Sequence, residues 1–121
     1  MANPSLKDSS DELTGLILSG RTLEALERFY APDIEMQEND HPPRKGKDLC
    51  METELDNLSR ISVVTPILLS REIDEALGTV RSAWEFHIIY RDGTEYLLRE
   101  VSVQQWKNGL VSRERFTYGR D

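Results

Sequence analysis

The sequence predicts an α+β domain, with helices in its first half and an antiparallel sheet in its second half. Up to Arg60 the apolar side chains recur at the three- and four-residue spacing of amphipathic helices. Beyond Arg60 the period falls to two, and β-branched and aromatic residues become concentrated. Two tight-turn sequences, at 91–94 and 108–109, divide this second half into strands. Helices followed by consecutive strands are typical of an α+β domain.

Three helices are expected from their start and stop signals. Ser9 precedes Glu12 by three residues, which is the capping pattern of a helix start, and Gly20 ends this first helix. Thr22 is placed to cap a second helix, which ends at an Ala-Pro-Asp sequence because the residue before a proline avoids the helical region. A third helix is expected over 47–58, after a loop that is rich in proline and polar residues.

The expected strands follow from side-chain alternation. A short strand over 34–38 separates the second and third helices. The longer strands are expected over 61–69, 80–90, 96–107 and 110–118. Pro66 interrupts the first of these, which places it near a sheet edge or a bulge.

Length and charge limit the organisation and the partners of the chain. Its 121 residues correspond to one domain, 1–121, without a linker or a repeat. Fifteen basic residues against 22 acidic ones give a net charge of -7, which argues against nucleic acid as a partner. No segment is apolar over the roughly 20 residues that a membrane span requires. No secretory leader is visible and Cys50 is the single cysteine, so we expect a cytoplasmic protein without an internal disulfide.

Alternation also assigns the strand side chains to two faces of the sheet. One face gathers nearly all the aromatic residues, so we expect it to meet the helices. Its members include Trp84, Phe86, Glu100, Ser102, Gln104, Trp106, Glu114 and Phe116. The other face mixes valines, such as Val101 and Val103, with charged residues, as expected of a surface that is exposed or pairs with a second subunit.

Five short segments carry a resemblance to a known family. They are 29–34 (FYAPDI), 36–39 (MQEN), 43–46 (PRKG), 101–109 (VSVQQWKNG) and 113–116 (RERF). In this order they resemble the NTF2-like superfamily, and within it SnoaL-like and ketosteroid-isomerase-like proteins. The resemblance implies a cone in which three N-terminal helices pack on a strongly curved antiparallel sheet and leave a pocket at the wide end. It also implies a homodimer and a protein that needs no cofactor.

The resemblance further implies that Glu38 is a general base. In ketosteroid-isomerase-like enzymes this role belongs to an acid that follows the first short strand and precedes a Pro-Arg-x-Gly turn, and Glu38 stands ahead of such a turn at 43–46. Burial in an apolar pocket raises the pKa of a carboxylate and fits it to take a proton from carbon beside a carbonyl. The tyrosine and second acid that stabilise the enolate in these enzymes are replaced, at about Leu13 and Ser102.

We therefore expect a pocket that binds a small, largely apolar organic molecule and catalyses proton transfer of isomerase, cyclase or lyase type. Its candidate lining residues and donors are Tyr30, Met36, Trp84, Phe86, Glu100, Ser102, Gln104, Trp106, Glu114 and Phe116. Glu100 or Glu114 could serve in place of Glu38, or could be buried partners of an arginine. His87 on the opposite face and His41 in the loop are reserve candidates, and with one cysteine they do not make a metal site.

A non-catalytic module that binds ligands or proteins as a homodimer is the alternative, because one fold hosts many functions. The missing oxyanion donors favour it. In either case we expect the subunits to meet through the outer sheet face, around Val101 and Val103.

Overall fold

The computed structural model describes residues 5–119 and confirms the α+β class. Its helices are α1 (Leu6–Leu18), α2 (Thr22–Phe29) and α3 (Lys47–Ser59). Its strands are β1 (Tyr30–Glu38), β2 (Arg44–Lys45), β3 (Ile61–Asp74), β4 (Thr79–Tyr90), β5 (Glu95–Lys107) and β6 (Leu110–Tyr118). The expectation of three helices ahead of the sheet is wrong in one respect, because α3 follows the first two strands.

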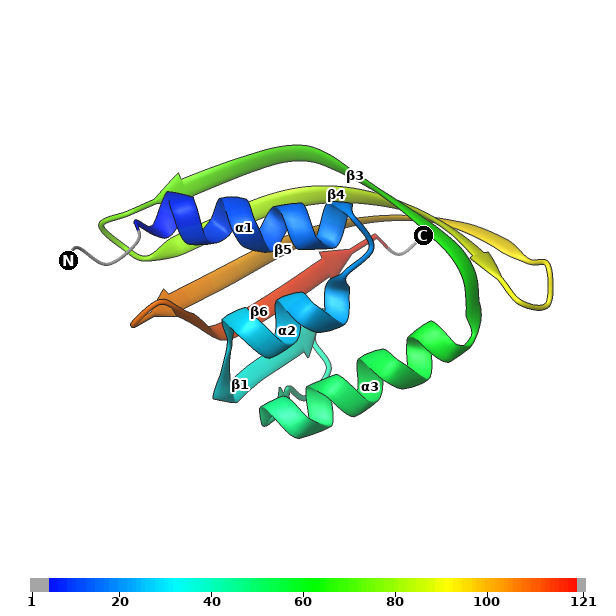
Figure 1. Cartoon of the computed structure of the whole chain (residues 1–121), viewed down its shortest axis with the longest axis horizontal. Coiled ribbons are helices and arrows are strands. Elements are labelled where there is room, and N and C mark those ends of the chain that lie inside the picture. The colour runs from blue at the N-terminus through cyan, green and yellow to red at the C-terminus, as the bar shows by residue number, and fades with distance from the viewer. Residues whose placement is uncertain (1–4, 120–121) are drawn as a thin grey trace.

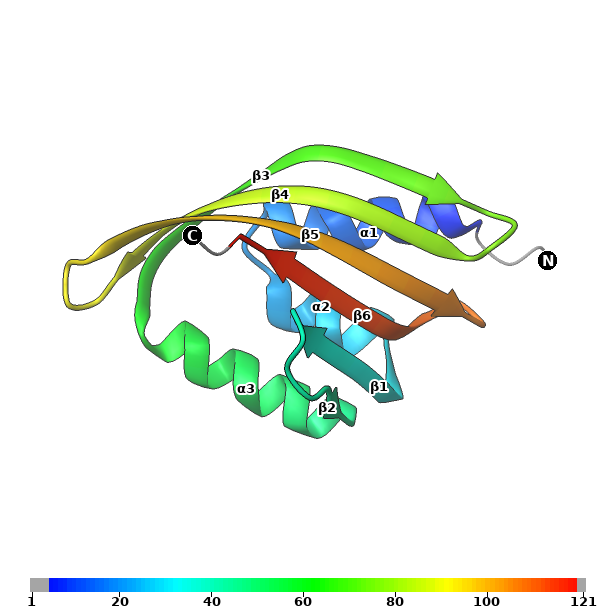
Figure 2. The ribbon, with the colours of Figure 1, turned by 180° about the vertical axis from the view of Figure 1, so that it is seen from behind.

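The described strands form a single curved sheet in the order β2-β1-β6-β5-β4-β3. Neighbours are antiparallel except β1 and β6, which run parallel, so the expectation of a wholly antiparallel sheet needs this correction. The parallel pair arises because the chain leaves β1 for β2 and α3, follows the long meander, and returns beside β1 only at its last strand. Figure 1 shows the helices on the concave side, and Figure 2 shows that none of them covers the convex side.

Bulges help the long strands to curve around the helices. The pairing register shifts between Leu68 and Ser70 in β3, and between Arg113 and Val111 in β6, opposite Gln105 and Trp106. An extra residue on one strand bends it and increases its twist. At the β3–β4 turn, Gly78 has a φ of +70°, and an added Cβ would lie 3.0 Å from the carbonyl oxygen of Trp106. This close approach of two backbones requires glycine.

The core joins α1 and α2 to the sheet. Its buried apolar side chains include Leu13, Leu16, Leu26, Phe29, Ile34, Val80, Trp106 and Val111. Phe29 meets Trp106 edge to face, with ring centroids 6.0 Å apart. Burial of each such side chain stabilises the fold by about 1.5–3 kcal/mol. No helix within residues 5–119 is long and apolar enough to cross a membrane.

Polar contacts fix α1 over β3. The Arg71 guanidinium donates hydrogen bonds to the hydroxyls of Ser10 and Thr14, each 3.2 Å long, and pairs with Asp11. The Glu75 carboxylate accepts from the backbone N–H groups of the first two residues of α1. These contacts hold α1, which forms one wall of the site described below.

Candidate functional site

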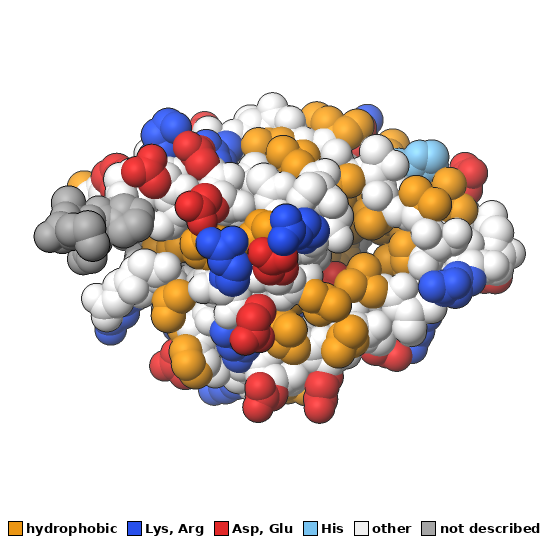
Figure 3. Space-filling view, in the orientation of Figure 1, with side chains coloured by type: hydrophobic (Ala, Val, Ile, Leu, Met, Phe, Trp, Pro, Cys, Tyr) orange, Lys and Arg blue, Asp and Glu red, His pale blue; other side chains and the backbone are white. Residues whose placement is uncertain are grey.

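A cavity of about 480 Å³ lies between the concave face of the sheet and the helices. This volume is in the range of small-molecule sites. Figure 3 shows a hollow in this side of the molecule, bordered largely by hydrophobic side chains. The apolar walls include Leu13, Ile17, Leu26, Met36, Val64, Trp84, Phe86, Ile88, Leu98 and Phe116. The sheet residues assigned to the inner face by alternation line this cavity, with the exception of Trp106.

Glu114 is the centre of a buried polar cluster in the wall of the cavity, with 2% of its surface exposed. Its carboxylate accepts hydrogen bonds from the hydroxyl of Ser102 at 2.5 Å and the amide of Gln104 at 3.0 Å. The hydroxyl of Tyr30 donates to the other carboxylate oxygen. The indole N–H of Trp106 donates to the Gln104 carbonyl at 3.0 Å, which turns the amide NH₂ toward Glu114. Three strands, β1, β5 and β6, thus bring these side chains together.

Burial raises the pKa of the Glu114 carboxyl, and the three donors oppose this effect without cancelling it. Burial and the neighbouring Glu114 raise the pKa of Tyr30 well above its ordinary value, so its hydroxyl keeps its proton. The hydrogen atoms of Tyr30, Ser102 and Gln104 all serve this cluster. They are therefore engaged before a ligand arrives.

Glu100 also lines the cavity, but its carboxyl, unlike that of Glu114, is not hydrogen-bonded in the described part of the chain. It is half-buried on β5, and among residues 5–119 it has no hydrogen-bond or ion-pair partner. Burial raises its pKa to about 7, with help from the charges of Glu114, Glu38 and Glu54. A carboxyl with a pKa near neutrality is able both to take and to return a proton.

Glu54 reaches the cavity from α3 and is also without a partner among the described residues. Burial raises its pKa, and the nearby charge of Arg44 works in the opposite direction. Sequence reasoning missed Glu54, because the apolar periodicity of α3 is too weak to show which side of this helix faces inward: of its residues only Cys50 is buried.

Glu38 lines the cavity at its edge and is held in an ion pair. Its carboxylate accepts from the Arg44 guanidinium at 2.8 Å, and 40% of its side chain is exposed. The Pro-Arg-Lys-Gly segment thus supplies the partner of the acid that precedes it. The carboxylate is therefore engaged by a cation within its own chain.

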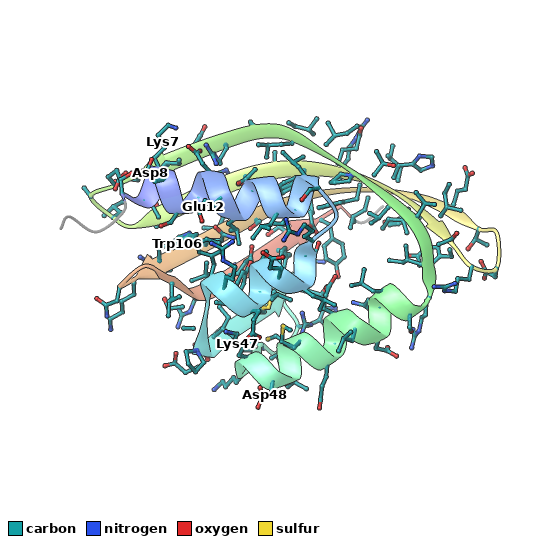
Figure 4. All side chains as sticks on the ribbon, in the orientation of Figure 1. Lys7, Asp8, Glu12, Lys47, Asp48 and Trp106 are labelled. Atoms are coloured by element: carbon teal, nitrogen blue, oxygen red, sulfur yellow. The ribbon has the colours of Figure 1, made fainter. Side chains whose placement is uncertain are left out.

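The remaining candidates separate into lining and non-lining residues. Trp106 lies in the core near the end of β5, as Figure 4 shows, and does not line the cavity. His87 is exposed on the convex face, 3.7 Å from Glu95. His41 is exposed in the loop after β1. Neither histidine reaches the cavity, and the described residues contain no group of three or more His, Cys, Asp or Glu side chains suited to a metal ion.

Comparisons with known proteins establish the fold. No family model and no curated protein matches the chain. Among solved structures, a candidate SnoaL-like polyketide cyclase from Mesorhizobium loti is 18% identical and aligns over 93% of this chain and 98% of its own, with a TM-score of 0.80. An NTF2-like protein of unknown function from Burkholderia pseudomallei is 13% identical over 97% of this chain and 92% of its own, also with a TM-score of 0.80.

A third similar structure is TerC co-crystallized with polyporic acid, which is 11% identical over 94% of this chain and 91% of its own, with a TM-score of 0.76. The chain therefore has the NTF2-like fold in the form that SnoaL-like proteins share, as the sequence resemblance implied. Because one fold hosts many functions, the activity has to be argued from the cavity itself.

Proposed function

We propose that the cavity binds a small organic molecule with a largely apolar body and catalyses a cofactor-free proton transfer in which Glu100 exchanges the proton. The observation that carries this proposal is an unpaired carboxyl, with a pKa of about 7, inside a cavity of apolar and aromatic walls. A neutral-range pKa gives Glu100 both protonation states at physiological pH. The co-crystal of TerC with polyporic acid supports an organic ligand in this fold.

The proposed step begins with ionised Glu100 and a C–H bond beside a carbonyl of the substrate. The carboxylate takes the proton, the electron pair of the C–H bond forms the enolate, and Glu100 then returns the proton to carbon or oxygen. No net oxidation or reduction occurs. An enolate formed in this way is a shared first step for isomerase, cyclase and lyase reactions of carbonyl compounds, and the choice among them depends on the substrate.

Glu38 remains the competing base, on the strength of the family resemblance. Its ion pair with Arg44 favours another role, in which the pair forms the rim of the cavity. Ketones and polycyclic enols, together with polyporic acid, are the compounds to screen for turnover. We expect Glu100→Gln to lower kcat by about 100-fold or more, while Glu38→Gln and the exposed control Glu52→Gln retain most of the activity.

The reverse pattern, with loss in Glu38→Gln and activity in Glu100→Gln, would assign the base to Glu38 and contradict the proposal. Circular dichroism of each variant separates loss of turnover from loss of folding. Compounds that bind tightly but are never turned over would favour the alternative of a non-catalytic module.

We further propose that two copies associate through the convex face of the sheet. This face exposes several apolar side chains: Val63 is 49% exposed, Leu97 50% and Val103 39%. Contiguous exposed apolar patches are typical of protein–protein contact surfaces. Val101 lies beside them on β5. Sedimentation equilibrium tests the proposal: a dimer that dissociates in Val103→Glu supports it, and a monomeric parent protein contradicts it.

A further inference from the structure

We infer that the ligand of this cavity carries a protonated amine beside its apolar body, and that the ammonium group lies between Glu54 and Glu100. The inference rests on the proposed function, because it concerns the same cavity, and it adds the chemical class of the substrate. Three independent features support it. They are the charges that line the cavity, the aromatic rings beside Glu100, and the negative net charge of the whole chain.

The charges of the cavity wall do not balance. The lining contains four acidic side chains and two basic ones, namely Glu38, Glu54, Glu100, Glu114, Arg44 and Arg60. Arg44 is paired with Glu38 at 2.8 Å, and Arg60 is paired with the exposed Asp56 at 2.8 Å. Glu54 and Glu100 are left without a cation, and a ligand that brings one would compensate them.

Glu100 stands between two aromatic residues on the inner face of the sheet. In the strand register its neighbour on β4 is Trp84 and its neighbour on β6 is Tyr118, and both of these side chains line the cavity. Trp84 stacks on Phe86, with ring centroids 5.4 Å apart and ring planes at 16°. Residues directly opposite on neighbouring strands have Cβ atoms about 4.5–5.5 Å apart. A cation at Glu100 therefore also lies within reach of aromatic faces, which attract ammonium groups.

Glu54 approaches from the other wall, on α3, and lines the same cavity as Glu100. Its charge is among those that raise the pKa of Glu100, so the two carboxylates repel one another. An ammonium between them relieves this repulsion and donates up to three hydrogen bonds to their oxygens. The net charge of -7 also attracts cations to the molecule from a distance. A neutral or anionic ligand would leave the carboxylates of Glu54 and Glu100 uncompensated.

The test is calorimetric binding of three probes that share one ring system: 1-naphthylmethylamine, 1-naphthylmethanol and 1-naphthoate. At pH 8 we expect the amine to bind at least about tenfold more tightly than the alcohol, and the naphthoate to bind most weakly. In Glu54→Gln and Glu100→Gln the preference for the amine should shrink while alcohol binding stays unchanged. Glu52→Gln, which removes the same charge from the exposed side of α3, should keep the preference.

The possible outcomes separate this inference from the proposed function. Equal affinity for amine and alcohol, or tightest binding of the naphthoate, overturns the cationic ligand while leaving proton transfer by Glu100 standing. A preference for the amine that survives both cavity substitutions also overturns it, because the attraction would then come from elsewhere. If none of the three probes binds at millimolar concentration, both the inference and the small-molecule cavity are contradicted.

Discussion

Replacing Glu100 by glutamine should stabilise the protein at pH 8 and leave its stability almost unchanged at pH 4.5. The pKa of Glu100 rises from 4.5 to about 7 on folding, since burial and three neighbouring acids penalise its charge. A group whose pKa is raised in the folded state contributes stability that is present below the unfolded pKa and lost as the pH rises through the folded pKa. The relevant window for Glu100 is therefore pH 4.5 to 7.

Each pH unit of this rise corresponds to about 1.4 kcal/mol, so the charged form of Glu100 costs the folded state about 3 kcal/mol above pH 7. The uncharged glutamine removes this cost. Urea unfolding followed by circular dichroism, at pH 4.5 and pH 8, gives the free energy of unfolding of parent and variant. Glu52→Gln is the control for removal of an exposed acid. A variant whose advantage over the parent is the same at both pH values would refute the raised pKa.

Three further substitutions test how the cavity is held. Gly78→Ala should cost about 1–2 kcal/mol in chemical denaturation because its backbone has a positive φ, with more lost to the 3.0 Å approach of the Trp106 carbonyl; an unchanged midpoint would contradict this. Ile34→Ala should lower the free energy of unfolding by about 2–5 kcal/mol, because Ile34 is fully buried, whereas a loss under 1 kcal/mol would mean that the site collapses freely. Arg71→Leu should cost about 1–3 kcal/mol and speed amide exchange in α1, since the buried Ser10 hydroxyl loses its donor; unaltered exchange would show that apolar packing alone holds α1.

The sheet was largely predictable from local patterns, and the helix starts were less so. The Asn-Gly turn at 108–109 predicted the β5–β6 hairpin, and β6 spans the expected 110–118. The first helix was expected from Ser9, but α1 begins at Leu6 with Ser5 as its cap, 3.1 Å from the Asp8 N–H. Glu75, far along the chain, also accepts from the N–H groups of this first turn. Such a tertiary contact has no local signature.

The end of β3 shows the same limit. The apolar run predicted a strand only to residue 69, whereas β3 continues to Asp74. Apart from Ile73, its last residues are polar, and they lie at the edge of the sheet, where Arg71 binds α1. Their pairing with β4 determines the strand there, and alternation of apolar residues does not.

The sequence predicted which residues of the sheet face the cavity, but not which of their side chains bind one another. Side-chain alternation placed Glu100, Ser102, Gln104 and Glu114 on one face of the sheet. The structure joins the last three in one hydrogen-bonded cluster. Side-chain alternation could not distinguish Glu114, whose carboxylate is hydrogen-bonded, from Glu100, whose carboxyl is unpaired among the described residues, because both face inward on neighbouring strands. That distinction depends on which donors lie across the sheet.

The pKa of Glu100 is the quantity on which this account depends most directly. Carbon-detected NMR of the side-chain carboxyls, followed from pH 4 to pH 9 and assigned by comparison with Glu100→Gln, measures it in the intact protein. The neighbouring carboxyls of Glu54 and Glu114 are followed in the same spectra. We predict a midpoint near 7 for Glu100, which falls when 1-naphthylmethylamine is added. A midpoint near 4.5 that the amine does not move would contradict both the proposed proton exchange and the cationic ligand.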